Sequence, residues 1–161
     1  MSIETHEMEA IGMLDSAVNR FLEEAGALLE SAAASASPVD NGQLKNSWTH
    51  VCDTGAKKVD VGSPLENAIW NEFGTGSHAE NGDGRKGYWV FVKGGGGGTS
   101  GSHKCYTLEE AKQVMAILRK KGLEAYYTNG KDPQHTLQHA MDNRKSLLKK
   151  RIEDILKGGM K

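Results

Sequence analysis

Histidine and cysteine side chains are the groups in this chain whose spacing comes closest to a chemical site. His135 and His139 lie four residues apart, so on a helix both imidazoles would face one side, where zinc could bind them. Cys52 or Cys105 could complete the ligand set. Such a site would suit a small zinc-dependent hydrolase built on His135, His139 and Cys105. The two histidines do not stand in HExxH order, so a metalloprotease is not indicated.

Other catalytic combinations are less complete. His103 stands two residues before Cys105, which does not by itself make a hydrogen-bonded nucleophile and base, and nothing places His139 beside that cysteine. Glu66 and Glu72 on a short helical turn have no visible acid–base partner. The two cysteines lack CxxC spacing and fit a reducing compartment. We therefore expect no enzyme activity, no catalytic residues, no cofactor and no bound metal.

Two glycine-rich segments are predicted to be loops. The segment 77–87 is polar and without period, and its acidic residues lack the distal Glu of a calcium loop, so we expect a mobile loop. The run of glycines from 94 to 98 has no Gly-Lys-Ser/Thr ending and no helix directly behind it. We interpret it as a tether or a mobile hairpin tip rather than a phosphate-binding loop.

Two helices are predicted at the ends of the chain. Apolar residues recur at helical spacing from residue 4 to about 35, and Pro38 ends this long helix. A second helix is predicted over 134–157 after Pro133, with an apolar stripe at Leu137, Ala140, Met141, Leu148, Ile152 and Ile155.

Strands are predicted between these helices. A core sheet is expected over 44–93, with a strand that begins at Leu44, a hairpin closed by residues 53–56, and a strongly β-forming run at 88–92. The segment 94–128 is expected to hold the glycine tether and an inserted strand–helix–strand unit. Its helix begins with a capping box, Thr107-Leu108-Glu109-Glu110.

These elements predict an α+β fold: a long N-terminal helix and a C-terminal helix packed on a small, mostly antiparallel β-sheet. A chain of 161 residues is long enough for one compact domain, so we expect a single domain over 1–161 with a small insertion. No apolar run is long enough to cross a membrane, and the N-terminus lacks a signal-peptide pattern.

The two terminal helices carry opposite charges, although the formal net charge is only −1. The first helix is acidic and the last is basic, with Arg144, Lys145, Lys149, Lys150, Arg151 and Lys157. These could be ordinary solvated helix faces, or complementary surfaces that meet between neighbouring copies of the chain. A third interpretation, a nucleic-acid-binding module that uses the basic helix, lacks interleaved aromatic residues for base stacking.

A further pattern lies in residues 38–76. It reads Pro38-x-Asp40-x-Gly42-x-Leu44-x-Asn46-Ser47, a hairpin, Val61-Gly62-Ser63, and then Ala68-x-Trp70-x-Glu72-Phe73-Gly74-Thr75-Gly76. This order resembles the minor tail-component family of long-tailed bacteriophages, and the final Glu-Phe-Gly-Thr-Gly is its most specific element. With Pro133 and Leu137, the resemblance is expected to cover most of the chain except 77–87 and 94–128.

The resemblance implies a structural virion protein at the head–tail interface, in tail completion or a neck ring. The implied partners are further copies of the chain in a cyclic homo-oligomer, a hexamer among the options, and neighbouring neck or tail proteins. No membrane is implied, and nucleic acid only as DNA that passes through the ring. The implied location is the virion neck, and the host cytoplasm during assembly. Candidate contact residues are His78, Glu80, Asp83, Arg85, Lys86, Arg144, Lys149 and Arg151.

Overall fold

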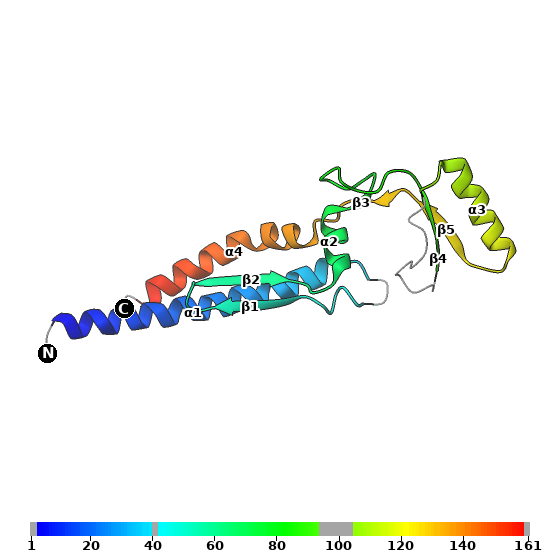
Figure 1. Ribbon diagram of the computed structural model, residues 1–161. Helices are drawn as coiled ribbons and strands as arrows, with labels where there is room; N and C mark the ends of the chain where they lie inside the picture. Colours follow the sequence, from blue (N-terminus) through cyan, green and yellow to red (C-terminus); the bar gives the residue numbers. More distant parts are fainter. Residues whose placement is uncertain (1–2, 40–41, 94–104, 160–161) are drawn as a thin grey trace. The chain divides into compact units, whose positions relative to one another are not determined.

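The computed structural model describes residues 3–39, 42–93 and 105–159 (Figure 1). The predicted glycine tether and the turn residues Asp40 and Asn41 lie outside these ranges. The elements in chain order are α1 (Ile3–Ala36), β1 (Thr49–Asp53), β2 (Lys58–Gly62), α2 (Glu66–Phe73), β3 (Thr75–Gly76), β4 (Trp89–Val92), α3 (Leu108–Lys120), β5 (Ala125–Thr128), β6 (Gly130–Lys131) and α4 (Thr136–Gly159).

The chain divides into two compact units, each with its own packing. Unit 1 comprises Met1–Ala68 and Thr136–Lys161, and unit 2 comprises Ile69–His135. The α+β class predicted from the sequence is confirmed. The strands do not join into one sheet, however: in the described ranges they form three separate two-stranded antiparallel pairs, β1–β2, β3–β6 and β4–β5. No described helix is long and apolar enough to span a membrane.

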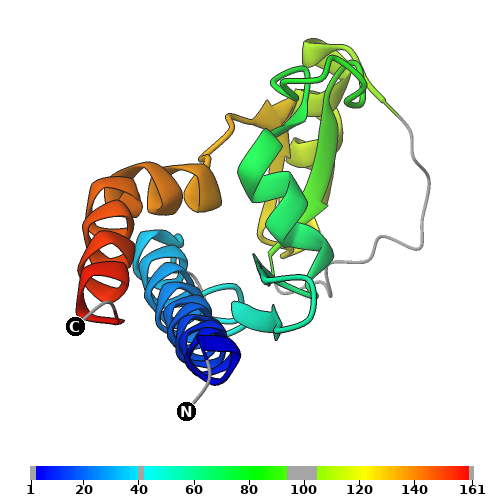
Figure 2. The same cartoon turned by 90° about the vertical axis from the view of Figure 1, so that its left-hand side faces the viewer.

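Unit 1 is built on α1, which packs with α4 and with the β1–β2 hairpin on different sides (Figure 2). The two helices are antiparallel, because Ala33 packs in one cluster with Ala140 while Glu24, nearer the start of α1, pairs with Arg151, nearer the end of α4. The core of this unit consists of buried residues from four segments: Ala33, Leu44, Trp48, Ala68 and Ala140.

The predicted hairpin is present, but its first strand begins later than expected. β1 pairs with β2 in the register Thr49↔Gly62 to Asp53↔Lys58. Leu44, predicted to begin this strand, lies instead in a turn in which the Asn46 N–H donates to the carbonyl oxygen of Gly42 at 3.0 Å. Leu44 and Trp48 are both buried in the core, although both precede the strand.

Unit 2 contains α3 and two strand pairs. The predicted capping box at α3 is confirmed, with Thr107 and Glu110 each accepting a hydrogen bond from the other's backbone N–H. The strand expected before α3 is only an isolated bridge between Tyr88 and Tyr106, and β5 pairs antiparallel with β4. The inserted unit is therefore a helix followed by one strand that completes a pair with β4.

Candidate assembly surfaces

The first part of α1 extends past the elements that pack on it (Figure 1). α4 ends at Gly159, eight residues after Arg151, so in the antiparallel pair it reaches only about residue 16 of α1. The hairpin turn reaches Asp15 through Lys57. We call the described residues before this point, 6–14, the α1 overhang.

The α1 overhang exposes large apolar side chains. Met8 and Ile11 are 68% and 67% exposed, and Met13 and Leu14 are also exposed. Met8, Ile11 and Leu14 are spaced three residues apart, which keeps them on neighbouring parts of the helix surface. A helix face of this kind gains free energy when a partner covers it, so it is a candidate contact surface.

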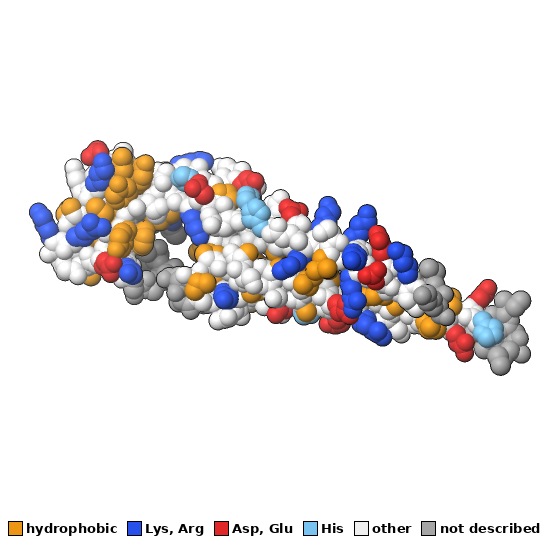
Figure 3. Space-filling view, turned by 180° about the vertical axis from the view of Figure 1, so that it is seen from behind, with side chains coloured by type: hydrophobic (Ala, Val, Ile, Leu, Met, Phe, Trp, Pro, Cys, Tyr) orange, Lys and Arg blue, Asp and Glu red, His pale blue; other side chains and the backbone are white. Residues whose placement is uncertain are grey.

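The surface of α4 combines basic and apolar side chains. Arg144 and Lys149, both predicted contact residues, are exposed, and Leu147, 47% exposed, lies within one helical turn of Arg144 and Lys150. Figure 3 shows blue Lys and Arg side chains gathered over this helix. An acidic helix with exposed apolar groups is the kind of partner that such a surface would complement.

Arg151, the third predicted contact residue on α4, is engaged within its own chain. Its Nε and a terminal nitrogen donate to the two carboxylate oxygens of Glu24 at 2.7 and 3.1 Å. These hydrogen bonds lower the pKa of Glu24 below its ordinary value, against the opposing effect of burial. Arg151 therefore joins α4 to α1.

The predicted mobile loop, residues 77–87, has defined local contacts. His78 Nδ1 lies 2.6 Å from Asp132 Oδ1, the Glu80 carboxylate lies 3.9 Å from His135 Nδ1, and the Lys86 ammonium donates to the Gly82 carbonyl at 3.0 Å.

The remaining predicted contact residues of this segment are Asp83 and Arg85. Asp83 is exposed, whereas the Arg85 guanidinium lies over the Trp89 ring, 5.0 Å from its centroid. Most of the predicted contact residues in 77–87 thus have partners inside unit 2. These partners lie in the segment itself, in β4 and in the residues that follow β6.

The Gly74-Thr75-Gly76 segment directly after α2 lies very close to the backbone of residues 129–131. β3 pairs with β6, and the Thr75 hydroxyl oxygen accepts from the Lys131 N–H at 3.0 Å. Gly76 has a φ of +62°, and a Cβ there would overlap the carbonyl oxygen of Asn129. The glycines that end this motif are therefore explained by backbone approach, and not by a ligand.

Unit 2 also exposes an aromatic pair that the sequence analysis did not single out as a surface. Phe91 and Tyr126 stack across β4 and β5 with ring centroids 5.7 Å apart, and the Arg119 guanidinium lies 5.4 Å from the Tyr126 centroid. The neighbouring Ala125 points to the other face and is fully buried. Strand alternation predicts that one of the Tyr126 and Tyr127 rings packs on the helix and the other faces solvent; in the structure both are partly exposed, at 37% and 36%.

Polar residues at helical spacing on α1 face the β1–β2 hairpin. They are Asp15, Asn19, Glu23 and Glu30. Lys57 pairs with Asp15, and its ammonium donates to the Asn19 side-chain oxygen at 2.9 Å. His50 bridges the other two, with Nδ1 2.6 Å from Glu30 Oε2 and Nε2 3.5 Å from Glu23 Oε2.

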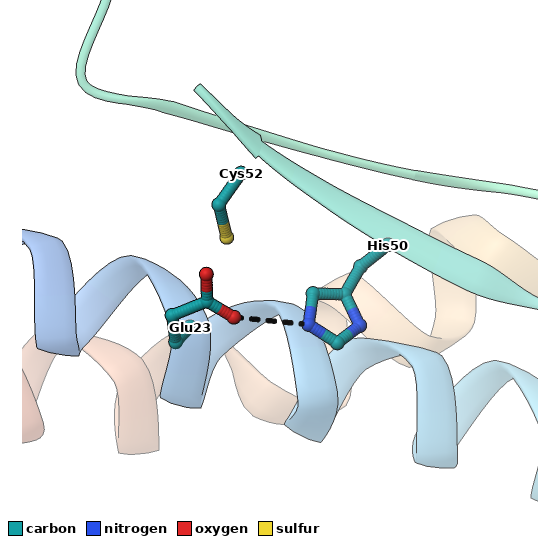
Figure 4. A group of neighbouring side chains, drawn as sticks. All are labelled: Glu23, His50 and Cys52. Carbon is teal, nitrogen blue, oxygen red and sulfur yellow. Dashed lines mark ion pairs between the residues drawn. The ribbon is translucent and has the colours of Figure 1, made fainter. Parts of the chain in front are cut away.

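Cys52 joins this polar group from the same strand (Figure 4). Partial burial, and then the Glu23 carboxylate, raise the pKa of the Cys52 thiol. The hydrogen bond to Glu30, followed by the contacts with Glu23, raises the pKa of His50 against the effect of burial. Both groups therefore hold their protons more tightly than usual.

The residues of the hydrolase alternative are not brought together. Among the residues that the structure describes, the one group of three metal-capable side chains is Glu23, His50 and Cys52. His135 and His139 with Cys105 form no such group in that part of the chain. Cys52, a possible ligand in the zinc alternative, lies instead with His50 of the same strand and with Glu23 of α1.

A comparison with protein families finds a match to the first part of this small α+β protein. Residues 5–74 match the family described as "Bacteriophage HK97-gp10, putative tail-component". The resemblance to phage tail components is thereby confirmed over α1, the hairpin and α2, while its expected extension to the last helix stays a prediction. No curated protein and no solved structure shows significant similarity to the chain.

The family match indicates a structural protein of a bacteriophage virion that interacts with other virion proteins. It favours a structural over an enzymatic role. The matched residues include the α1 overhang from residue 6 onward and the whole β1–β2 hairpin.

Proposed function

We propose that the protein acts at the head–tail interface of a phage or prophage virion, where copies assemble into a ring during tail completion or neck formation. The observation that carries this proposal is the α1 overhang: an apolar helix face, in the family-matched part of the chain, that extends past its own α4 and hairpin.

The contact between copies pairs the α1 overhang of one copy with the α4 surface of the next. The overhang carries Glu7 and Glu9 beside its apolar residues, and α4 carries Leu147 among Arg144 and Lys150. Opposite charges around an apolar centre set the register of an interface and discriminate against wrong partners.

Such a contact joins two different surfaces, and repetition of a heterologous contact closes into a ring when the rotation between neighbours allows it. The ring of copies would then contact neighbouring neck or tail proteins. The residues of 77–87, among them the exposed Asp83, are the candidates for these outer contacts.

Incorporation into particles tests the contact. Ile11→Glu places a charge at the centre of the overhang, and burial of an Ile contributes about 1.5–3 kcal/mol. The matched control is Ile117→Glu, which makes the same change at a 55% exposed helix position in unit 2. Both variants should show the wild-type helix content by circular dichroism.

In cells that supply the other virion proteins, the wild-type chain and Ile117→Glu should co-purify with particles at equal copy number, and Ile11→Glu should be lost from them. Concentrated Ile11→Glu should also lose any self-association that sedimentation detects for the wild type. Incorporation of Ile11→Glu at the wild-type copy number would contradict the proposed contact.

A further inference from the structure

We propose that Glu23, His50 and Cys52 form a binding site for a divalent transition-metal ion of the zinc class, which joins the β1–β2 hairpin to α1 (Figure 4). This proposal is independent of the head–tail function proposed above.

The backbone positions the three side chains for one ion. His50 and Cys52 are two residues apart on β1, so both point to the same face of the strand, toward α1. Glu23 comes from the facing side of α1, and its Oε2 lies 3.5 Å from His50 Nε2. Two ligands of a tetrahedral ion with bonds of about 2.1 Å are about 3.4 Å apart, so this pair is already spaced for zinc.

The Cys52 thiol completes the set of three donor groups. One donor atom from each of Glu23, His50 and Cys52 lies within 4.8 Å of the other two. Small rotations of the carboxylate and thiol would bring all three to tetrahedral spacing. The Glu23 side chain is 63% exposed, so water can reach a fourth position.

Glu30 supplies the outer contact that a metal-binding histidine needs. Its Oε2 lies 2.6 Å from His50 Nδ1, on the opposite side of the ring from Nε2. A carboxylate in this place fixes the orientation of the imidazole, holds the proton on Nδ1 and leaves Nε2 for the metal. The His50 side chain is only 21% exposed, which further restricts its orientation.

The donor types select the metal. An imidazole nitrogen, a thiolate sulfur and a carboxylate oxygen suit zinc or cobalt, whereas calcium and magnesium require oxygen ligands. On binding, the ion would replace the thiol proton of Cys52, which is released to water, and the two carboxylates and the resulting thiolate would supply the negative charge that a divalent cation requires. Because the ligands come together only in the folded chain, binding would stabilise the contact between hairpin and helix.

The test uses the full-length chain, stripped of metal with a chelator and kept reduced. Zn²⁺ affinity is measured by competition with a chromophoric chelator, and Co²⁺ is added as a spectroscopic probe. The wild type should bind one ion per chain, show a thiolate-to-cobalt charge-transfer band and unfold at a higher temperature when Zn²⁺ is present.

Variants assign the ligands. Cys52→Ser should lose the charge-transfer band and the thermal shift, and bind Zn²⁺ at least about tenfold more weakly. Glu30→Gln should weaken binding by about 10- to 100-fold while it keeps the band, because it removes only the outer contact. Cys105→Ser and His139→Gln are the matched controls and should bind as the wild type does.

Several results would overturn the proposal. They are absence of stoichiometric binding by the wild type, wild-type affinity in Cys52→Ser, or loss of binding in Cys105→Ser. Circular dichroism of each metal-free variant separates lost ligands from lost folding. A Cys52→Ser chain that folds normally and binds Zn²⁺ with the wild-type affinity would leave the three side chains as a purely polar contact.

Discussion

Gly26 of α1 leaves the space in which the His50 ring of the hairpin lies. A Cβ at Gly26 would stand 2.8 Å from His50 Cγ and 2.9 Å from Val59 Cγ2, closer than packed atoms tolerate. The absence of a side chain at this one position therefore lets the hairpin approach the helix closely enough for His50 to reach Glu23 and Glu30.

Gly26→Ala should destabilise unit 1, although alanine is the better helix former. We expect a loss of about 1–3 kcal/mol from overpacking against His50 and Val59. The control is Gly12→Ala, where a Cβ meets nothing within 4 Å and where helix propensity alone should stabilise by up to about 1 kcal/mol. Urea unfolding followed by circular dichroism measures both; a stabilised Gly26→Ala would show that the hairpin does not pack as described.

Ser37→Ala should remove two linked, buried hydrogen bonds at the end of α1. The Trp48 indole N–H donates to the Ser37 hydroxyl oxygen at 2.7 Å, and that hydroxyl donates to the Ala33 carbonyl at 2.8 Å. Without the hydroxyl, the buried indole has lost its acceptor, which costs about 1–3 kcal/mol.

The matched control for Ser37→Ala is Ser35→Ala. Its hydroxyl makes the same type of backbone hydrogen bond, to Ser31, on an exposed face. Denaturant unfolding should leave Ser35→Ala near the wild type, and equal losses in the two variants would argue against the role of the indole contact.

Local rules predicted the helices well and the sheet poorly, for physical reasons. The capping box at Thr107 and the long periodic stripe of α1 depend on neighbours in sequence, which the sequence displays. The extent of the sheet depends on contacts between distant segments. Leu44 shows this: its apolar character favours a strand, whereas it lies in a turn and belongs to the buried cluster that contains Ala33 and Trp48.

The ion pair between Glu24 and Arg151 should make stability depend on pH. Hydrogen bonds from Arg151 hold the pKa of Glu24 below its ordinary value of 4.5. The ion pair therefore stabilises the folded state fully above pH 4.5, and this stabilisation is lost as the pH falls through the lower pKa of the folded state. The stability difference between the wild type and Glu24→Gln should therefore be constant near neutral pH and shrink in acid.

Urea unfolding at a series of pH values measures this difference. Arg151→Gln serves as the control, because without the guanidinium the Glu24→Gln substitution should no longer change the acid dependence. A difference that grows as pH falls below 4.5 would have the wrong sign for a lowered Glu24 pKa.

Gly76→Ala should break the β3–β6 pairing in unit 2. A Cβ at Gly76 would overlap the Asn129 carbonyl and come within 2.7 Å of the Trp89 ring. Amide hydrogen exchange across residues 125–131, and at the Ser77 N–H that donates to Asn129, should become at least about tenfold faster.

Gly82→Ala is the control for Gly76→Ala, because it separates backbone strain at a positive φ from steric overlap of the added Cβ. Gly82 also has a positive φ, of 71°, but a Cβ there meets nothing within 4 Å. Gly82→Ala should lose only about 1 kcal/mol of local stability and leave exchange over 125–131 unchanged. Equal acceleration in both variants would mean that backbone strain, and not the approach to Asn129, explains the glycine.

The group of Glu23, His50 and Cys52 was beyond the sequence analysis because its members are joined only by tertiary packing. Glu23 lies on a helix rich in acidic residues, where nothing local distinguishes it from Glu24, which faces α4 instead. Two signals were present: the His-x-Cys alternation on a predicted strand, and a glycine in the middle of a long helix. Together they indicate a close approach of strand and helix.

The position of the chain in intact particles tests the central proposal most directly. A tagged copy that supports normal particle formation can be located by electron microscopy with a tag-specific label. We expect label at one position per particle, where the tail meets the head. Label spread along the tail tube, label at the distal tip, or complete absence of the chain from purified particles would contradict it.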